Sequence, residues 1–296
     1  MIMQEKVKVS LASEDNRYDT IFTSLDLIKK EINDEIALLD GKEDYILVKP
    51  NCLAGDRQLC ATHVDALRAT LHFICSLWQG RLILAEGSAM GSTIEAFRNY
   101  KYEEMKLDFP NLEFLDLNYS DAVNIDVVDN DLKPITIQVS NTVIQAPMRV
   151  SVGPAKTHDA VVVTLSIKNM AVGSILKEDK EKIHRGFRGI NKSLAILYEH
   201  THPHLAVIDA WESMEGNGPY HGNKVETHFA VASTNSIAAD TLVAELMGFN
   251  PLQIGYLNML GAEKIKAQTE IVGKSREGFQ FHFRPHKTYL EQINWM

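Results

Sequence analysis

Side chains that can bind anions and move protons gather in short stretches of this chain. Four of these stretches are Lys49-Pro50-Asn51, Glu86-Gly87-Ser88, Lys168-Asn169 and the acidic run 209–215. A further triplet, Lys156-Thr157-His158, opens the segment 156–173. Lysine ammonium groups bind carboxylates and phosphates, while histidine and carboxylate side chains exchange protons near neutral pH. The residue types therefore indicate acid–base chemistry on a small anionic molecule.

Each candidate residue can be assigned the role that suits its side chain. Substrate binding is expected of Lys49, Asn51, Glu86, Ser88, Lys168 and Asn169. Catalysis by proton transfer is expected of Lys156, His158 and His184. The competing interpretation needs no site, because lysines at strand ends can extend to solvent and loops between strands and helices are usually polar. It treats His184, between Lys182 and Arg185, as an ordinary exposed histidine.

Three carboxylates in the acidic run are candidates for a metal site. Asp209, Glu212 and Glu215 fall close together in sequence, and carboxylates at this density repel each other unless a cation, a lysine or protons compensate. We expect them to hold a divalent metal or to act as partner bases. A solvated acidic turn is the alternative.

The elements that must position these residues follow an alternating pattern. Strands are predicted at 45–48, 81–85, 113–117, 160–165, 205–209 and 229–232, and helices at 20–38, 61–78, 93–105, 191–200 and 236–247. Such alternation predicts an α/β fold with a mostly parallel sheet and helices on both faces. The carboxyl ends of parallel strands lie along one edge, where ligand crevices form. We therefore expect the four polar stretches to meet in one cleft at that edge.

Three other segments depart from this alternation. Residues 121–152 alternate polar and apolar side chains, which predicts an antiparallel insertion or a second lobe. We expect one α/β domain over residues 1–296, which could divide into two lobes near residues 120–150. The charged segment 177–188 has no evident core face and is predicted to be a loop or lid. The tail from residue 273 is basic and aromatic, and is expected to pack back as an extended arm.

Composition excludes several classes of partner and cofactor. The formal net charge is −9, so nucleic acid would be repelled. No apolar run approaches the ~20 residues of a membrane helix, and the N-terminus has no apolar signal core, so we expect a cytoplasmic protein with no membrane partner. The three cysteines form no C-x-x-C pair, so neither an iron–sulphur cluster nor a disulfide framework is expected.

The order and spacing of several motifs resemble domain-of-unknown-function family 362. The motifs are VKPN (48–51), AEGS (85–88), KTH…VTLSIKNMAVG (156–173), His184, IDAWESMEGNGPYHG (208–222) and AADTLVAELMGFNP (238–251). The resemblance covers residues 45–260 and implies the α/β fold of bacterial and archaeal members. It also matches Gly218 and Asp240 to the family pattern. Many members carry ferredoxin-like cysteine clusters, which this chain lacks, and the resemblance implies no particular reaction.

Two functional hypotheses follow from these observations. In the first, the protein is an enzyme that acts on a small anionic metabolite by acid–base chemistry, with a divalent metal as a candidate cofactor. Isomerases, hydrolases and proton-transfer lyases all use such residues. In the second, it is a non-catalytic cofactor-binding or accessory protein. Residues 177–188 then contact another subunit, and a second copy of this chain, in a homo-oligomer, is one such subunit.

Overall fold

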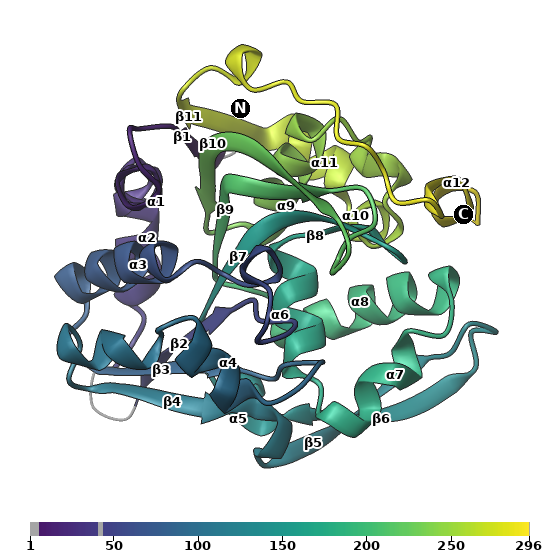
Figure 1. Cartoon of the computed structure of the whole chain (residues 1–296), viewed down its shortest axis with the longest axis horizontal. Helices are drawn as coiled ribbons and strands as arrows, with labels where there is room; N and C mark the ends of the chain where they lie inside the picture. The colour runs from purple at the N-terminus through teal and green to yellow at the C-terminus, as the bar shows by residue number, and fades with distance from the viewer. Residues whose placement is uncertain (1–5, 41–43, 296) are drawn as a thin grey trace, which may run out of the picture.

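The computed structural model describes residues 6–40 and 44–295, and a large mixed β-sheet forms its centre (Figure 1). The strands of this sheet are β1 (Val7–Ala12), β2 (Tyr45–Pro50), β3 (Arg81–Glu86), β4 (Leu112–Asp116), β7 (Met148–His158), β8 (Val162–Thr164), β9 (Leu205–Glu215), β10 (Asn223–Ser233) and β11 (Thr269–Gly273). Their order is β11-β1-β10-β9-β7-β2-β3-β4, and β8 pairs with β7 off this path. The central strands are apolar and buried on both faces, as parallel strands between two helix layers must be.

The strand order reverses between β2 and β7. The strands from β9 through β7, β2 and β3 to β4 are all parallel to their neighbours, whereas β10 is antiparallel to both β9 and β1. The chain runs outward from β2 to β3 and β4, and then returns to place β7 on the other side of β2. In open α/β sheets, ligand crevices form at the carboxyl ends of the strands beside such a reversal. The topology therefore singles out the ends of β2 and β7.

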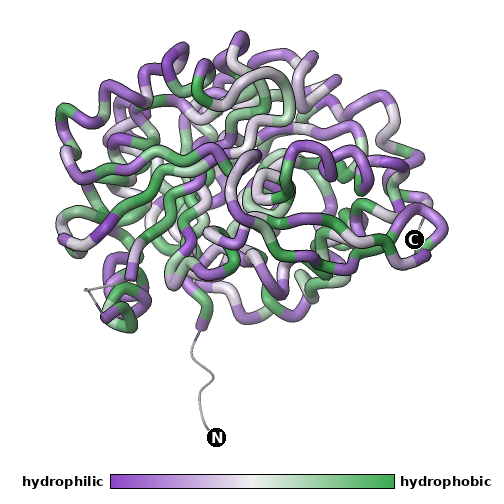
Figure 2. The backbone as a smooth tube through the Cα atoms, turned by 90° about the horizontal axis from the view of Figure 1, so that it is seen from below, coloured by the Kyte–Doolittle hydropathy of each residue, from purple (hydrophilic) through white to green (hydrophobic). Residues whose placement is uncertain are grey.

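Helices cover both faces of the sheet, which confirms the predicted fold class (Figure 1). One face packs against α1 (Arg17–Asp26), α2 (Lys29–Ile36), α3 (Val64–Leu77) and α4 (Thr93–Asn99). The other packs against α6 (Ser166–Ser174), α8 (Phe187–Thr201), α9 (Ser236–Leu246), α10 (Gly255–Met259) and α11 (Ala262–Gln268). Along β2, Ile46 and Val48 join the first layer, and Leu47 joins the second beside Met170. Figure 2 shows hydrophobic segments running through the interior and hydrophilic segments mostly at the periphery.

The remaining elements are short. They comprise α5 (Asn141–Ile144), α7 (Lys180–Ile183) and α12 (Tyr289–Ile293), with 3₁₀ turns at Gln58–Cys60, Glu103–Leu107, Leu117–Tyr119, Lys177–Asp179, Pro251–Gln253 and Arg276–Gly278. After β11 the chain packs back over the molecule, where Phe281 N donates to Leu246 O at 2.9 Å. Within the described residues, no helix combines the length and the apolar character needed to cross a bilayer.

The predicted antiparallel insertion is a hairpin of β5 (Ala122–Val128) and β6 (Pro134–Ser140), which forms its own two-stranded sheet. Its inward residues, among them Ile125 and Val139, share a hydrophobic cluster with Leu194 of α8. The predicted range 121–152 was too long, since its last residues begin β7.

The predicted core strand at 160–165 was wrong. The long strand is β7, whose 11 residues are all buried and which ends with Lys156, Thr157 and His158. The chain then turns, and only Val162–Thr164 is a strand, antiparallel to β7. Valine-rich sequence suited the core strand, but the true strand contains a lysine and a histidine, which hydrophobic periodicity reads as a boundary.

Three further local predictions also need correction. Segment 177–188 is not a solvated loop, because it forms a 3₁₀ turn and α7 and buries Lys180 and Ile183. The acidic run 209–215 is not a loop either, because it continues β9 and pairs with β10, with Glu215 opposite Asn223. Lys168 and Asn169 lie inside α6, one turn beyond the strand end at which they were expected.

Candidate functional site

A cavity of about 350 Å³ opens at the carboxyl ends of β2, β3 and β7, beside the reversal of strand order. Most of the residues proposed from the sequence line it, namely Lys49, Asn51, Glu86, Lys156, His158, Lys168, Asn169 and His184. They come from three strand ends, from α6 and from the turn after α7. Residues up to 135 positions apart in sequence therefore meet in one place, as the parallel-sheet argument requires.

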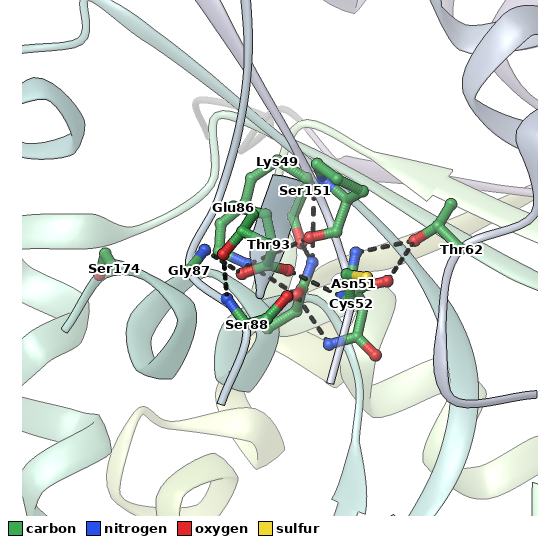
Figure 3. Close-up of polar contacts among 12 residues, drawn as sticks. Lys49, Asn51, Cys52, Thr62, Glu86, Gly87, Ser88, Thr93, Ser151 and Ser174 are labelled. Atoms are coloured by element: carbon green, nitrogen blue, oxygen red, sulfur yellow. Dashed lines mark hydrogen bonds and ion pairs between the residues drawn. The ribbon is translucent and has the colours of Figure 1, made fainter. Parts of the chain in front are cut away.

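Lys49 and Glu86 form a buried ion pair at the base of this cavity (Figure 3). Lys49 Nζ lies 2.9 Å from Glu86 Oε1 and 3.0 Å from Oε2, and also donates to Asn169 Oδ1 and Pro50 O at 3.0 Å. Burial lowers the pKa of Lys49, and the charge of Glu86 opposes that shift. Since every Lys49 donor is engaged, the pair serves as a brace between β2 and β3 rather than as a free anion-binding group.

Two asparagines connect this brace to Lys156. Asn169 Oδ1 accepts from Lys49 Nζ at 3.0 Å and from Asn51 Nδ2 at 3.1 Å. Asn51 Oδ1 in turn accepts a hydrogen bond from Lys156 Nζ. Each amide is therefore oriented by its neighbours, and the network fixes the end of β7 against β2 and α6.

Two buried lysines in the wall of the cavity have only neutral partners. Lys156, which is 1% exposed, donates to Asn51 Oδ1 and to Cys60 O at 3.1 Å. Lys180, which is 5% exposed, donates to Asn118 Oδ1 at 3.0 Å. Burial lowers the pKa of each lysine to about 8. Within the described part of the chain, neither ammonium group has a carboxylate at ion-pair distance. A buried charge without an opposite charge is costly, and an anion in the cavity would offset that cost.

Lys168 is still less satisfied than these two. It is 6% exposed, and among the described residues its ammonium group has no hydrogen-bond acceptor and no carboxylate partner. Burial lowers its pKa to about 7, with Lys156 and Lys49 contributing in the same direction and Asp159 opposing them. At neutral pH a large fraction of this side chain is therefore the free amine.

Two histidines, His158 and His184, lie next to each other in the cavity wall, with ring centroids 6.4 Å apart. His158 is buried, which lowers its pKa and keeps the ring neutral, and its Nδ1 accepts from Ala160 N at 3.0 Å. His158 Nδ1 also lies 3.0 Å from Asp159 Oδ1, and we assign the ring proton to Nε2 because Nδ1 accepts from Ala160 N. His184 is open to solvent at the cavity mouth, and its Nδ1 lies 2.6 Å from Lys180 O. That contact requires a proton on Nδ1, so the lone pair of His184 is on Nε2. The pair thus offers one donor and one acceptor.

Asp240 positions the helix that carries Lys168 and Asn169. This carboxylate lies in the middle of α9, fully buried, and accepts from Ser166 N at 2.9 Å and from Ile167 N at 3.1 Å. It therefore caps the first turn of α6, where the backbone N–H groups have no helical partner. Burial raises the pKa of Asp240 to about 7.

Glycines make room for the buried pair. A Cβ on Gly173 would lie 2.1 Å from Lys49 Nζ and 2.8 Å from Glu86 Oε1. A Cβ on Gly87 would lie 2.8 Å from Gly173 O and 3.1 Å from Lys180 Nζ. The close approach of α6 to the strand ends therefore depends on these two positions having no side chain.

The predicted metal site at Asp209, Glu212 and Glu215 is not assembled. Arg17 lies 3.1 Å from Asp209 and 2.7 Å from Glu212, while Glu215 pairs with Arg284. None of the three carboxylates lines the cavity. Across residues 6–40 and 44–295, no group of three or more His, Cys, Asp or Glu side chains is arranged to hold a metal ion. The crowded charges are compensated by arginines distant in sequence, so the expectation that Asp209 faces the same cleft was wrong.

Two further expectations also change. Ser88 is fully buried, its backbone donates to Thr93 Oγ1 and accepts from Asn118 Nδ2, and it does not line the cavity. Lys180 was missed because segment 177–188 reads as a solvated surface. Ile183, which directly precedes His184 and is buried, was an apolar signal that this segment packs inward.

The fold and site together define an α/β protein with a lysine-rich pocket at the reversal point of its sheet. A family model described as a domain of unknown function (DUF362) matches residues 46–245, and the chain belongs to this family. A thylakoid-associated protein of Synechocystis sp. is 25% identical over 219 residues, which are 71% of this chain. The chain spans 65% of that protein's length.

Two solved structures are similar in fold only. The lactate racemase apoprotein from Thermoanaerobacterium thermosaccharolyticum has 12% identity and a TM-score of 0.49, over 79% of this chain and 55% of the other. A protein from Thermotoga maritima has 9% identity and a TM-score of 0.38, over 84% of this chain and 60% of the other. At these values the similarity carries no argument about activity.

Proposed function

We propose that the protein is an enzyme that transfers a proton on a small anionic metabolite. The observation that carries this proposal is the cavity wall, in which Lys156, Lys168 and Lys180 are buried without carboxylate partners beside two neutral histidines. Cavities of roughly 300–1,000 Å³ bind small molecules, and this one holds about 350 Å³. A small carboxylate or phosphate fits both its size and its charge.

Substrate binding is assigned to two lysines whose ammonium groups have no carboxylate partner among the described residues. Lys156 and Lys180 would donate to the anionic group of the substrate, and their present partners are neutral oxygens that hold each side chain in place. Lys49 and Glu86 neutralise each other and support the wall. Asn51 and Asn169 orient Lys156 and Lys49, so their part is to position these groups.

Proton transfer is assigned to the histidines. The Nε2 lone pair of His184 would accept a proton from the bound substrate, and the Nε2–H group of His158 would donate one. A base and an acid on one substrate suit isomerisation or elimination. The metal at residues 209–215 is not carried into this proposal, since Arg17 and Arg284 already compensate those carboxylates.

A deuterium-exchange experiment tests the enzyme hypothesis. Wild-type protein is incubated in D₂O with a set of 2-hydroxy and 2-oxo carboxylates and their phosphorylated analogues, and loss of C–H signal is followed by proton NMR. Exchange by wild type that is lost in His184→Gln and retained in Lys264→Met, an exposed position outside the cavity, supports the proposal. Binding of these anions without exchange contradicts it and favours a non-catalytic binding protein.

We also propose that the protein acts in the cytoplasm. Cys52, Cys60 and Cys75 are free thiols, as is usual in a reducing compartment. Because one relative is named thylakoid-associated, the test is to fractionate cells. Recovery of the protein in the membrane pellet, resistant to a high-salt wash, would contradict this location.

A further inference from the structure

We propose that Lys168 is a nucleophile that forms a Schiff base with the carbonyl group of a small anionic oxo compound. This inference rests on the proposed function, because it names the substrate class of the same cavity. Its structural basis is that Lys168 lines the cavity, is 6% exposed, and has no hydrogen-bond or ion-pair partner among the described residues.

Lys168 differs in this respect from the other buried lysines of the cavity. Lys49 is engaged by Glu86 and Asn169, Lys156 by Asn51, and Lys180 by Asn118, so each is held as a donor. The nitrogen of Lys168 has no such commitment and can approach a bound carbonyl carbon. A lysine that only bound an anion through fixed geometry would be expected to have the same neutral acceptors as its neighbours.

The surroundings of Lys168 favour the neutral amine, which is the reactive form. Burial is the main cause that lowers the pKa of Lys168; Lys156 at the end of β7 and Lys49 at the end of β2 act in the same direction, and Asp159 between β7 and β8 opposes them. His158 and His184 line the same cavity, and burial is the main cause that lowers the pKa of both rings, so they add no positive charge beside the amine. Desolvation together with adjacent cations is how lysines become nucleophiles at neutral pH.

The reaction balances without an oxidant or a further reactant. The amine lone pair attacks the carbonyl carbon, and the carbonyl oxygen takes a proton to give a carbinolamine. The nitrogen supplies that proton, the resulting hydroxyl takes a second proton and leaves as water, and a C=N⁺ bond remains. The Nε2–H group of His158 is one source of the second proton. The iminium then draws electrons from the adjacent carbon, so that His184 Nε2 can accept its proton.

Borohydride trapping tests this assignment. Full-length protein is incubated at pH 7.5 with pyruvate or glyoxylate, reduced with sodium borohydride, digested and mapped by mass spectrometry. We expect the reduced adduct on Lys168 at least about tenfold above that on the exposed Lys264, because the lowered pKa frees a much larger fraction of amine. In Lys168→Arg the cavity adduct should disappear.

Two outcomes would overturn the inference. If adducts form equally on exposed lysines and on Lys168, Lys168 is not the nucleophile. If no adduct forms on Lys168 while calorimetry still detects binding of phosphate or pyruvate, Lys168 is again not the nucleophile, but the anion site stands. If neither adduct nor anion binding is found, the proposed function fails as well. A second test uses only the wild-type protein, so that it does not depend on the folding of the variant. The rate of adduct formation on Lys168 should rise through pH 7 and level off by pH 9, and a rate that keeps rising to pH 10 contradicts the assignment.

Discussion

Lys49 Nζ and the carboxylate of Glu86 meet at 2.9 and 3.0 Å, where two neighbouring parallel strands end. The two side chains are 0% and 2% exposed. Glu86 also accepts from Cys52 N at 2.8 Å and from Gly87 N at 2.7 Å, so the pair ties the loops after β2 and β3 together. The base of the cavity is thus a neutral, fully bonded unit, and the positive charge of the site resides in the other lysines.

Removal of one charge of this pair should be strongly destabilising. Glu86→Gln leaves the buried Lys49 without its anion, and broken buried pairs cost about 3–5 kcal/mol. Chemical denaturation measures the free energy of unfolding. The matched control is Glu113→Gln, which breaks the exposed pair with Arg81 on the adjacent strands and should cost less than about 1 kcal/mol. Equal losses in the two variants would show that Lys49 and Glu86 are not coupled as described.

A methyl group at position 173 should disrupt the site from the helix side. The Cβ of Gly173→Ala would lie 2.1 Å from Lys49 Nζ, so either α6 or the ion pair must shift. We expect a loss of about 1–3 kcal/mol in the free energy of unfolding, together with weaker anion binding. Gly278→Ala is the control, because its Cβ would have no atom within 4 Å. A Gly173→Ala protein as stable and as competent in binding as Gly278→Ala would contradict the close packing.

The pH dependence of stability should show the burial of Lys168. Burial lowers its pKa in the folded state to about 7 from the ordinary lysine value of 10.5. Between these pH values the unfolded chain binds more protons, so the contribution of Lys168 to the free energy of unfolding increases as pH rises. At about 1.4 kcal/mol for each pKa unit, the increase is on the order of 4 kcal/mol. Burial is the main cause of this lowered pKa; the charge of Asp159 opposes it, and the charges of Lys156 and Lys49 add to it.

The measurement compares wild type with Lys168→Met, so that other titrating groups cancel. The variant should be the more stable protein at pH 7, and its advantage should shrink steadily toward pH 10. A difference that does not change between pH 7 and pH 10 would mean that the folded protein does not lower the pKa of Lys168.

The sequence was enough to predict that the site lies at one edge of the sheet, because a single rule of parallel sheets applies to several strands. Lys49, Glu86 and Lys168 were expected at one edge, since the carboxyl ends of parallel strands lie together. The rule did not depend on exact strand bounds, and it succeeded although the core strand was placed at 160–165 instead of at β7. A buried lysine and a buried histidine interrupt the hydrophobic pattern of β7. The end of this strand was therefore mistaken for the polar residues that precede the next one.

The sequence could not show which charges are compensated. Asp209 and Glu212 looked like metal ligands because their partner, Arg17, is distant in sequence, 195 residues from Glu212. Lys180 looked solvated because its acceptor, Asn118, is 62 residues away. Long-range pairing of this kind depends on tertiary packing, for which local patterns give no signal. It decided which of the proposed residues remain free to bind a ligand.

The most direct test of the anion site is calorimetric titration of the protein with phosphate and with pyruvate at pH 7. We expect wild type to bind one anion per chain, and Lys180→Met to bind it at least about tenfold more weakly, since a hydrogen bond to a charged group is worth about 1.5–3 kcal/mol. Lys264→Met, at an exposed position outside the cavity, should bind like wild type. Absence of binding in wild type, or equal affinity in Lys180→Met and wild type, would contradict the account.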